Sequence, residues 1–247
     1  MSTRTLKRWL AALVVACAVE ALYIYVRLTH GVPSTAYQAA NRPGVIYWHG
    51  STDRNAVALT FDDGPSMPYT AQLLAILDAN HVRATFFMIG KNVEQLPAAA
   101  KAVADAGHAI GNHTFGHPNL NFERESQVGT ELARAESAIT AATGMRPRLF
   151  RPPYGDVDRF TLHESRQLGY VAVEWSVSSK DWQMPGSDAI VANVLRDVHN
   201  GAIILMHDGG GDRSQTVEAV ARLIPELQQR GYELVTVPEL LGLPQAR

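Results

Sequence analysis

The feature that most constrains this chain is the alternation of short apolar runs with longer segments of helical period after residue 44. Seven runs are predicted as strands: 56–61, 84–89, 108–111, 148–150, 170–175, 202–206 and 233–237. Helical periodicity marks the segments between them, at 70–80, 96–107, 123–144, 187–198 and 215–231. This order predicts parallel strands joined by right-handed crossovers. Periodicity leaves open whether the α/β sheet closes into a barrel or stays open and doubly wound.

Polar side chains follow one predicted strand after another. Those with possible chemistry are Asp62, Asp63, Asn112, His113, His117, Arg151, Tyr154, Asp181, Trp182, His207 and Asp208. Barrels and open α/β sheets both build their sites at the C-terminal ends of the strands. We therefore expect these side chains to converge on one site.

Two adjacent aspartates occur in the stretch LTFDDGP, residues 59–65. One aspartate before a glycine is explained by a turn, but two suggest a further role. Successive strand residues face opposite ways. We expect both carboxylates to reach one site because the strand ends at Phe61 and Gly64–Pro65 turns the chain.

Two histidines stand four residues apart in HTFGH, His113 to His117. A helical turn would aim both rings at one point. With a carboxylate from another loop they would form a two-histidine, one-aspartate metal site with open positions. Their occurrence by chance in a polar loop is the alternative, and the other polar residues at the same edge favour the metal site. The motif lacks the glutamate base of HExxH, so the base must come from elsewhere. It also lacks the close H-x-D/E pair of iron oxygenases, which disfavours redox chemistry.

A known family matches these features. TFDDGP, HTFGH, RPPYG, DW and LMH occur in this order over about residues 55–240, where the chain resembles the polysaccharide deacetylases, the NodB-homology domain of carbohydrate esterase family four. The resemblance implies a distorted (β/α) barrel, here with about seven parallel strands. It also implies removal of acetyl groups from N-acetylated sugars or O-acetylated polysaccharides. The implied cofactor is one divalent metal ion, usually Zn²⁺, with Co²⁺ or Mn²⁺ as alternatives.

The resemblance also implies roles for single residues. Asp63, His113 and His117 would ligate the metal. Asp62 would be the general base that takes a proton from metal-bound water, which the cation acidifies from a pKa near 15.7 to about 7. His207 would be the general acid that protonates the leaving amine.

Five further residues would support this chemistry. Arg151 would hold Asp62 ionised and oriented, and Asp181 would keep His207 charged and aimed. The backbone N–H of Tyr154 would stabilise the oxyanion. Trp182 and Leu205 would line the pocket for the acetyl methyl group.

Simpler structural explanations exist for single residues. Arg151 could be a surface charge before Pro-Pro, Trp182 a core residue, and His207 a satisfied strand-end histidine. The sequence departs from the family at SSKDW, where Ser178 stands at a position that is often aspartate. That departure puts details of the substrate groove in doubt, not activity.

The N-terminus has features typical of an export signal. Arg4, Lys7 and Arg8 precede the apolar run 10–26, which is near the minimum spanning length. We expect residues 1–27 to form a cytoplasmic tip and a membrane or signal helix, 28–43 a linker, and 44–247 the deacetylase domain. Glu20 costs about 3 kcal/mol on insertion. A cleaved signal at 16–18, which would give a secreted protein, is the main alternative, and a lipoprotein or a buried helix are others.

Composition limits the partners. The chain has 247 residues with 22 basic and 24 acidic side chains and no basic field, which disfavours nucleic acid. The single cysteine, Cys17, excludes a disulfide framework. No protein partner is implied. The expected partners are an acetylated polysaccharide and, through the N-terminal segment, the membrane.

These observations predict a membrane-tethered enzyme whose catalytic domain lies outside the cytoplasm. Its reaction would be deacetylation of N-acetylglucosamine units of a polysaccharide, and the topology favours peptidoglycan. One alternative is an esterase acting on O-acetylated xylan or exopolysaccharide. Another is a non-catalytic glycan-binding module, although a binder would not need base, ligands, arginine and acid together.

Overall fold

The computed structural model describes residues 46–123 and 125–243, which belong to one compact unit. The predicted membrane or signal segment and its linker lie outside the described residues. Among the residues described, no helix has the length and apolar character needed to cross a membrane.

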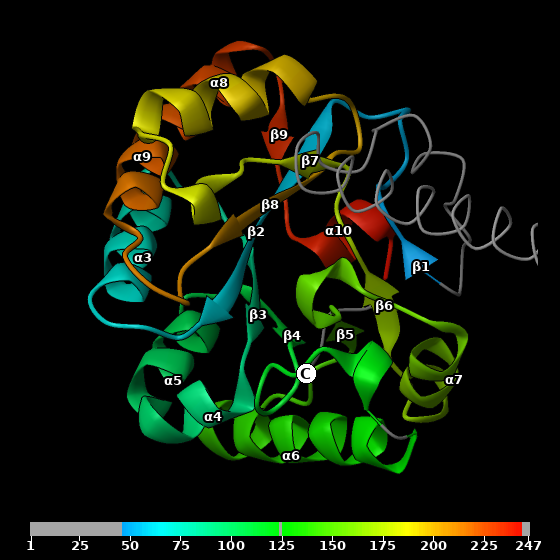
Figure 1. Cartoon of the computed structure of the whole chain (residues 1–247). Coiled ribbons are helices and arrows are strands. Elements are labelled where there is room, and N and C mark those ends of the chain that lie inside the picture. Colours follow the sequence, from blue (N-terminus) through cyan, green and yellow to red (C-terminus); the bar gives the residue numbers. More distant parts are fainter. Residues whose placement is uncertain (1–45, 124, 244–247) are drawn as a thin grey trace, which may run out of the picture. The chain divides into compact units, whose positions relative to one another are not determined.

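A curled parallel sheet forms the interior of this unit (Figure 1). Its strands are β1 (Ile46–Tyr47), β2 (Ala56–Gly64), β3 (Thr85–Met88), β4 (Ala109–Asn112), β5 (Leu149–Phe150), β6 (Val171–Val173), β7 (Val177–Ser178), β8 (Ile203–His207) and β9 (Glu233–Leu234). Their order is β1-β6-β5-β4-β3-β2-β8-β7, with β9 paired to the start of β2. Between the described strands, no pairing joins β1 to β7, so the sheet has the form of an incompletely closed barrel.

Helices cover the outside of the sheet (Figure 1). They are α3 (Tyr69–Ala79), α4 (Gly90–Gln95), α5 (Pro97–Asp105), α6 (Glu125–Thr143), α7 (Arg159–Gln167), α8 (Ser187–Asp197), α9 (Ser214–Gln229) and α10 (Val237–Leu241). The five helices predicted from periodicity are present with ends shifted by up to two residues. The parallel α/β class is confirmed.

The last predicted strand was wrong in extent. Residues 233–237 were expected to be extended, but β9 stops at Leu234 and a helix begins at Val237. Thr236 caps that helix: its side chain accepts from the Glu239 N–H, and the Glu239 carboxylate accepts from the Thr236 N–H. This capping box stabilises a helix start, and it outweighs the extended preference of Val235 and Val237.

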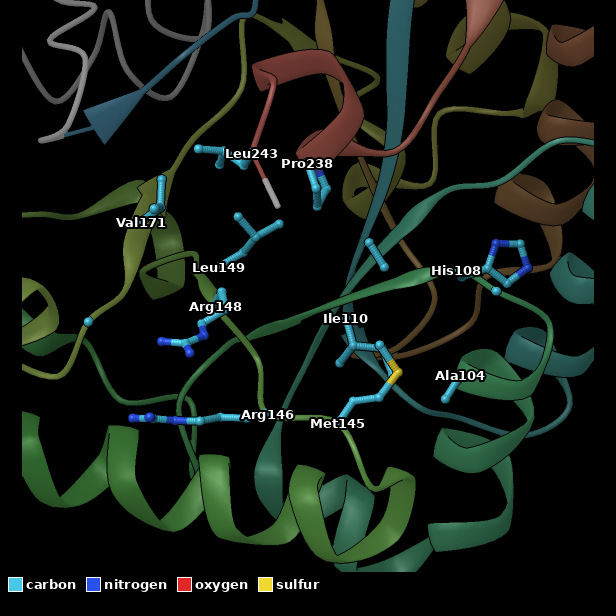
Figure 2. Close-up of a pocket in the computed structure, with 13 residues that line it drawn as sticks. Ala104, His108, Ile110, Met145, Arg146, Arg148, Leu149, Val171, Pro238 and Leu243 are labelled. Carbon is cyan, nitrogen blue, oxygen red and sulfur yellow. The ribbon is translucent and has the colours of Figure 1, made fainter. Parts of the chain in front are cut away.

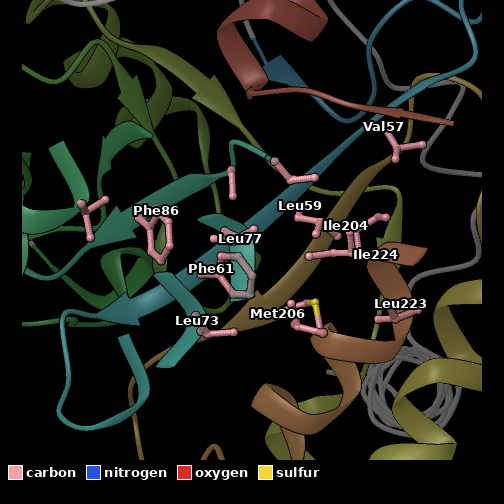
Figure 3. Packing of buried hydrophobic residues seen from close by; sticks show 14 of the residues in the cluster. Val57, Leu59, Phe61, Leu73, Leu77, Phe86, Ile204, Met206, Leu223 and Ile224 are labelled. Atoms are coloured by element: carbon pink, nitrogen blue, oxygen red, sulfur yellow. The ribbon is translucent and has the colours of Figure 1, made fainter. Parts of the chain in front are cut away.

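The main core lies between β2, β8 and the helices α3 and α9 (Figure 3). Phe61 of β2 stacks on Phe86 of β3 with 5.0 Å between ring centroids. Leu73 and Leu77 of α3 are fully buried against them. Burying side chains of this size stabilises by about 1.5–3 kcal/mol each. The core therefore holds β2 rigidly up to its C-terminal end, where the two aspartates lie.

Strand β2 continues through both aspartates instead of ending at Phe61 as expected. Asp62 pairs with Phe87, and the next paired residue on β2 is Gly64, opposite Met88. Asp63 is thus the extra residue of a β-bulge, with a φ of 72°. A bulge re-aims one side chain. Both carboxylates reach the same side of the strand end for this reason, and not because the strand has ended.

Candidate active site

Three side chains form a group that could hold a metal ion. Asp63, His113 and His117 each offer one ligand atom, and these atoms lie within 4.8 Å of one another. Oδ1 of Asp63 lies 3.5 Å from Nε2 of His113 and 3.2 Å from Nε2 of His117. This Oδ1 is buried and has no hydrogen-bond partner among the described residues. A buried carboxylate oxygen facing two imidazole nitrogens is a donor set suited to a divalent cation.

A hydrogen bond to the backbone fixes the orientation of the His113 ring. Its Nδ1 lies 2.7 Å from the carbonyl oxygen of Arg151, so Nδ1–H donates there and Nε2 keeps its lone pair toward Asp63. Metal-binding histidines are commonly oriented by such a bond. Burial opposes charge on this ring, but Asp62 and Asp63 outweigh it and raise the pKa of His113. Burial likewise opposes ionisation of Asp63, yet the neighbouring imidazoles of His113 and His117 hold its pKa well below the usual range.

The HTFGH segment is an irregular loop and not the helical turn we expected. Thr114 and His117 both have left-handed backbones, with φ of 66° and 61°. Two anchors hold the loop: Asn112 Oδ1 accepts from the Thr114 N–H, and Glu131 of α6 accepts from the N–H groups of Phe115 and Gly116. The anchored loop brings the two rings to a centroid distance of 5.0 Å.

Asp62 pairs with Arg151 as predicted. Arg151 Nη1 lies 2.7 Å from Asp62 Oδ1, and both side chains are buried. The remaining guanidinium donors bind Thr60 Oγ1 and the carbonyl oxygens of Val173 and Glu174. Arg151 is therefore no surface charge. It fixes the position of Asp62 and compensates its buried negative charge.

His207 pairs with Asp181 at the neighbouring edge. Nδ1 of His207 lies 2.8 Å from Asp181 Oδ1, and the His207 N–H donates to Oδ2. Thr216 of α9 donates to the same Oδ2. Burial alone would lower the pKa of His207, but Asp181 outweighs burial and, with Asp62 and Asp63, raises it to about 9. The imidazole is consequently protonated at neutral pH.

The three predicted substrate residues occur on segments that also carry or contact residues of this centre. The Tyr154 ring packs edge-on against His117 with 4.7 Å between centroids, and Tyr154 has a left-handed φ of 64°. Its backbone N–H has no acceptor within the described ranges. Trp182 is 50% exposed, so it is not a core residue. Leu205 is buried in β8 and pairs with Thr60 of β2 and Ser178 of β7.

Sequence reasoning named Asp208 only as a polar strand-end residue and missed its structural role. Its carboxylate is buried against Gly64, and Oδ2 accepts a 2.5 Å hydrogen bond from Thr70. Ser66 donates to its backbone oxygen. Burial, followed by the charges of Asp63 and Asp62, raises the pKa of Asp208 to about 7. The roles of Thr60 and Glu131 were also missed. Thr60 begins TFDDGP and Glu131 stands in no motif, and only the folded chain brings them to Arg151 and to the HTFGH loop.

Known proteins share this sequence and fold. Residues 49–173 match the family model described as polysaccharide deacetylase. A peptidoglycan-N-acetylglucosamine deacetylase of Bacillus cereus is 39% identical over 80% of this chain and 93% of its own length. A chitooligosaccharide deacetylase of a Bradyrhizobium species is 41% identical over 75% of this chain and 90% of its own.

Two solved structures show the range of the family. The Bc1960 peptidoglycan N-acetylglucosamine deacetylase superposes with a TM-score of 0.80 at 35% identity, covering 82% of this chain and 95% of its own. The BA3943 protein of Bacillus anthracis superposes with a TM-score of 0.75 at 31% identity, covering 79% and 68%. It is described as a pseudoenzyme, so shared fold alone does not establish catalysis, and the side chains of the site must carry that argument.

Proposed function

The chain belongs to the polysaccharide deacetylase family, and on this premise we propose that it is a metal-dependent N-deacetylase acting on N-acetylglucosamine units of a polysaccharide. It is a hydrolase of carbon–nitrogen bonds other than peptide bonds. The observation that carries the proposal is that the two adjacent aspartates have different partners. Asp62 faces a buried arginine, whereas Asp63 faces two histidines. A glycan-binding module would need neither pairing.

Asp63, His113 and His117 would hold the metal ion. When bound, a divalent cation acidifies a water molecule and polarises the acetyl carbonyl, whether it is Zn²⁺, Co²⁺ or Mn²⁺. Asp62 then serves as the general base, because Arg151 holds its Oδ1 while Oδ2 lies 3.9 Å from Nε2 of His113, on the side of the ligand group. Such a positioned base contributes about 10²–10⁴-fold to rate.

His207 completes the reaction as the general acid. As the tetrahedral carbon collapses, the bond to nitrogen breaks and the His207 imidazolium transfers its proton to the departing amine. Asp181 holds Nδ1, which leaves the Nε2 proton for transfer. The unpaired N–H of Tyr154 is the donor proposed for the oxyanion, and one such donor is worth about 3 kcal/mol.

The surface around the site suits a sugar chain. The large exposed hydrophobic residues of the described chain are Met67, Tyr154, Phe160, Trp182 and Met184. All follow the C-terminal ends of β2, β5 or β7, on the side of the sheet that carries Asp62 and Asp63. Exposed aromatic rings offer apolar faces to sugar rings, and Trp182 and Leu205 are proposed to border the acetyl methyl group.

Peptidoglycan is the proposed polysaccharide. A curated relative and a solved relative are named as peptidoglycan-N-acetylglucosamine deacetylases, and the N-terminal segment favours export to the cell envelope. Acetate release from peptidoglycan, chitooligosaccharides and acetylated xylan tests this choice. We expect the highest kcat/KM on peptidoglycan. Preference for acetylated xylan would instead support the O-acetyl esterase, and no release from any of the three would support a binding module.

We also propose that residues 1–27 anchor the domain outside the cytoplasm, since three basic residues precede the apolar run 10–26. A periplasmic-type reporter fused after residue 43 should be active, and a cytoplasmic-type reporter at the same point inactive. The reverse pattern would contradict the topology. The mass of the mature protein distinguishes an uncleaved anchor from a cleaved signal.

A further inference from the structure

A cavity (Figure 2) lies at the ends of the strands opposite to those that carry the candidate active site. Its volume is about 700 Å³, within the range of small-molecule sites. The walls include the starts of β4, β5 and β6, at Ile110, Leu149 and Val171, together with Pro238 of α10. The proposed metal ligand His113 and the positioning residue Arg151 follow the other ends of β4 and β5, so the two sites are separate.

The wall of this cavity is mainly apolar. Besides these four residues it includes Met145 and Leu243. Protein interiors contain few voids larger than a water molecule, since lining atoms without neighbours lose dispersion contacts. An apolar chain in the cavity would restore those contacts. The wall contains no aromatic side chain except the His108 ring, unlike the surface around Tyr154 and Trp182, so a sugar is a poor fit.

The charged side chains that line the cavity are all positive. No aspartate or glutamate is among the lining residues, whereas Arg146 and Arg148 are. Figure 2 shows both arginines on one side of the cavity and His108 on the other. Arg146 is already paired, with Nε 2.9 Å from Glu136 Oε1. The Arg148 backbone carbonyl accepts from the Val171 N–H, but its exposed guanidinium has no hydrogen bond or ion pair with any described residue.

His108 adds no charge. Its Nδ1 accepts from the Ala84 N–H at 3.1 Å, which leaves the ring proton on Nε2. Burial, followed by the charge of Arg83, lowers the pKa of His108 to about 4. The Arg148 guanidinium is therefore the one uncompensated charge in the described wall. Its planar fork matches a carboxylate or a phosphate.

We propose that this cavity binds an anionic amphiphile, with an apolar chain against Ile110, Leu149 and Val171 and a carboxylate or phosphate head on Arg148. A free fatty acid and an anionic phospholipid share this chemistry. Membrane tethering would favour the phospholipid, because Ile46, the first described residue after the proposed linker 28–43, pairs with Ala172 beside Val171.

Photolabelling of the full chain in dodecyl maltoside tests the proposal. Two probes carry a diazirine near the end of an acyl chain: a fatty acid and a phosphatidylglycerol. Adducts are expected on peptides that contain 145–149 or 238–243, and the probe that labels identifies the source. Dodecyl phosphate should compete, and dodecanol should not. Labelling that is scattered over the chain, or that dodecanol suppresses equally, would overturn the proposal.

Variants make the test specific. Arg148→Gln should lower labelling about tenfold, as expected for loss of a charge-assisted pair, with acetate release unchanged. Arg148→Lys should retain part of the labelling. Arg222→Gln is the matched control, because Arg222 pairs with Asp188 on the surface away from the cavity wall. Equal labelling of Arg148→Gln and wild type contradicts the proposed head-group site. Labelling of a chain ending at residue 243 but not of the full chain would show that residues 244–247 fill the cavity, which also contradicts it.

Discussion

Arg151 Nη1 lies 2.7 Å from Asp62 Oδ1 in a pair of buried side chains, and the Arg151 carbonyl accepts from Nδ1 of His113. One residue thus positions the proposed base through its side chain and a proposed metal ligand through its backbone. The left-handed bulge at Asp63 turns the second carboxylate away from this arginine toward the histidines. The distinct roles of two adjacent aspartates depend on these two features.

The first prediction concerns Arg151. Arg151→Met leaves Asp62 as an uncompensated buried charge, which should lower the free energy of unfolding by about 3–5 kcal/mol. Arg151→Lys keeps the charge but loses the fork that also binds Thr60 and Glu174. Its kcat/KM should fall about 10²-fold through misplacement of the base. Urea unfolding and acetate release measure the two effects.

A surface arginine provides the control for that prediction. Arg222→Met removes an exposed pair with Asp188 and should change the free energy of unfolding by no more than about 1 kcal/mol. A fully stable and active Arg151→Met protein would contradict the role given to Arg151.

The second prediction concerns pH. His207 must be protonated to act as an acid, so activity should persist up to its raised pKa and fall above it. Asp181→Asn removes the carboxylate that holds the pKa of His207 near 9, so the alkaline limb of kcat/KM should move to lower pH. A bound metal cation would repel the His207 imidazolium equally in the wild type and in Asp181→Asn, so the difference between their alkaline limbs reports the loss of the Asp181 carboxylate. An unchanged alkaline limb in Asp181→Asn would exclude His207 as the acid.

The third prediction concerns Gly64. A Cβ at this position would lie 2.2 Å from Asp208 Oδ2, so Gly64→Ala must displace either the Asp208 carboxylate or the strand end that carries Asp63. We expect a lower Tm and weaker metal binding, measured by calorimetry and metal titration. Gly129→Ala, within α6, should instead raise stability by up to about 1 kcal/mol, because its Cβ would meet only the flexible end of Glu164, at 3.3 Å. Normal metal affinity in Gly64→Ala would show that Asp208 does not pin the strand end.

The sequence predicted the fold class because its longer elements have strong periodicity. It missed β1 and β7, which have two residues each, too few for a period of two to be visible. It also missed α7, whose sequence RFTLHESRQ is mostly polar. Such a helix is stabilised by its Asp158 cap and its contacts rather than by an apolar stripe.

The site was predictable in composition but not in geometry. Ordered motifs placed Asp62, Asp63, His113 and His117 at one edge, and the structure brings all four together. The bulge at Asp63 and the irregular HTFGH loop were not foreseen, because both depend on partners distant in sequence. Glu131 lies 15 and 16 residues from the amides it binds, and Asn92, whose side chain donates to the Asp63 carbonyl, lies 29 residues away.

The most direct test measures metal content and acetate release on the same purified samples. The wild type should hold about one divalent ion per chain, release acetate from N-acetylated peptidoglycan, and lose activity on chelation. Asp62→Asn should keep the ion and lose about 10²–10⁴-fold in kcat, whereas His113→Ala should lose both ion and activity. Full activity after exhaustive metal stripping would contradict the account. Loss of the metal ion in Asp62→Asn, together with its retention in Asp63→Asn, would also contradict it.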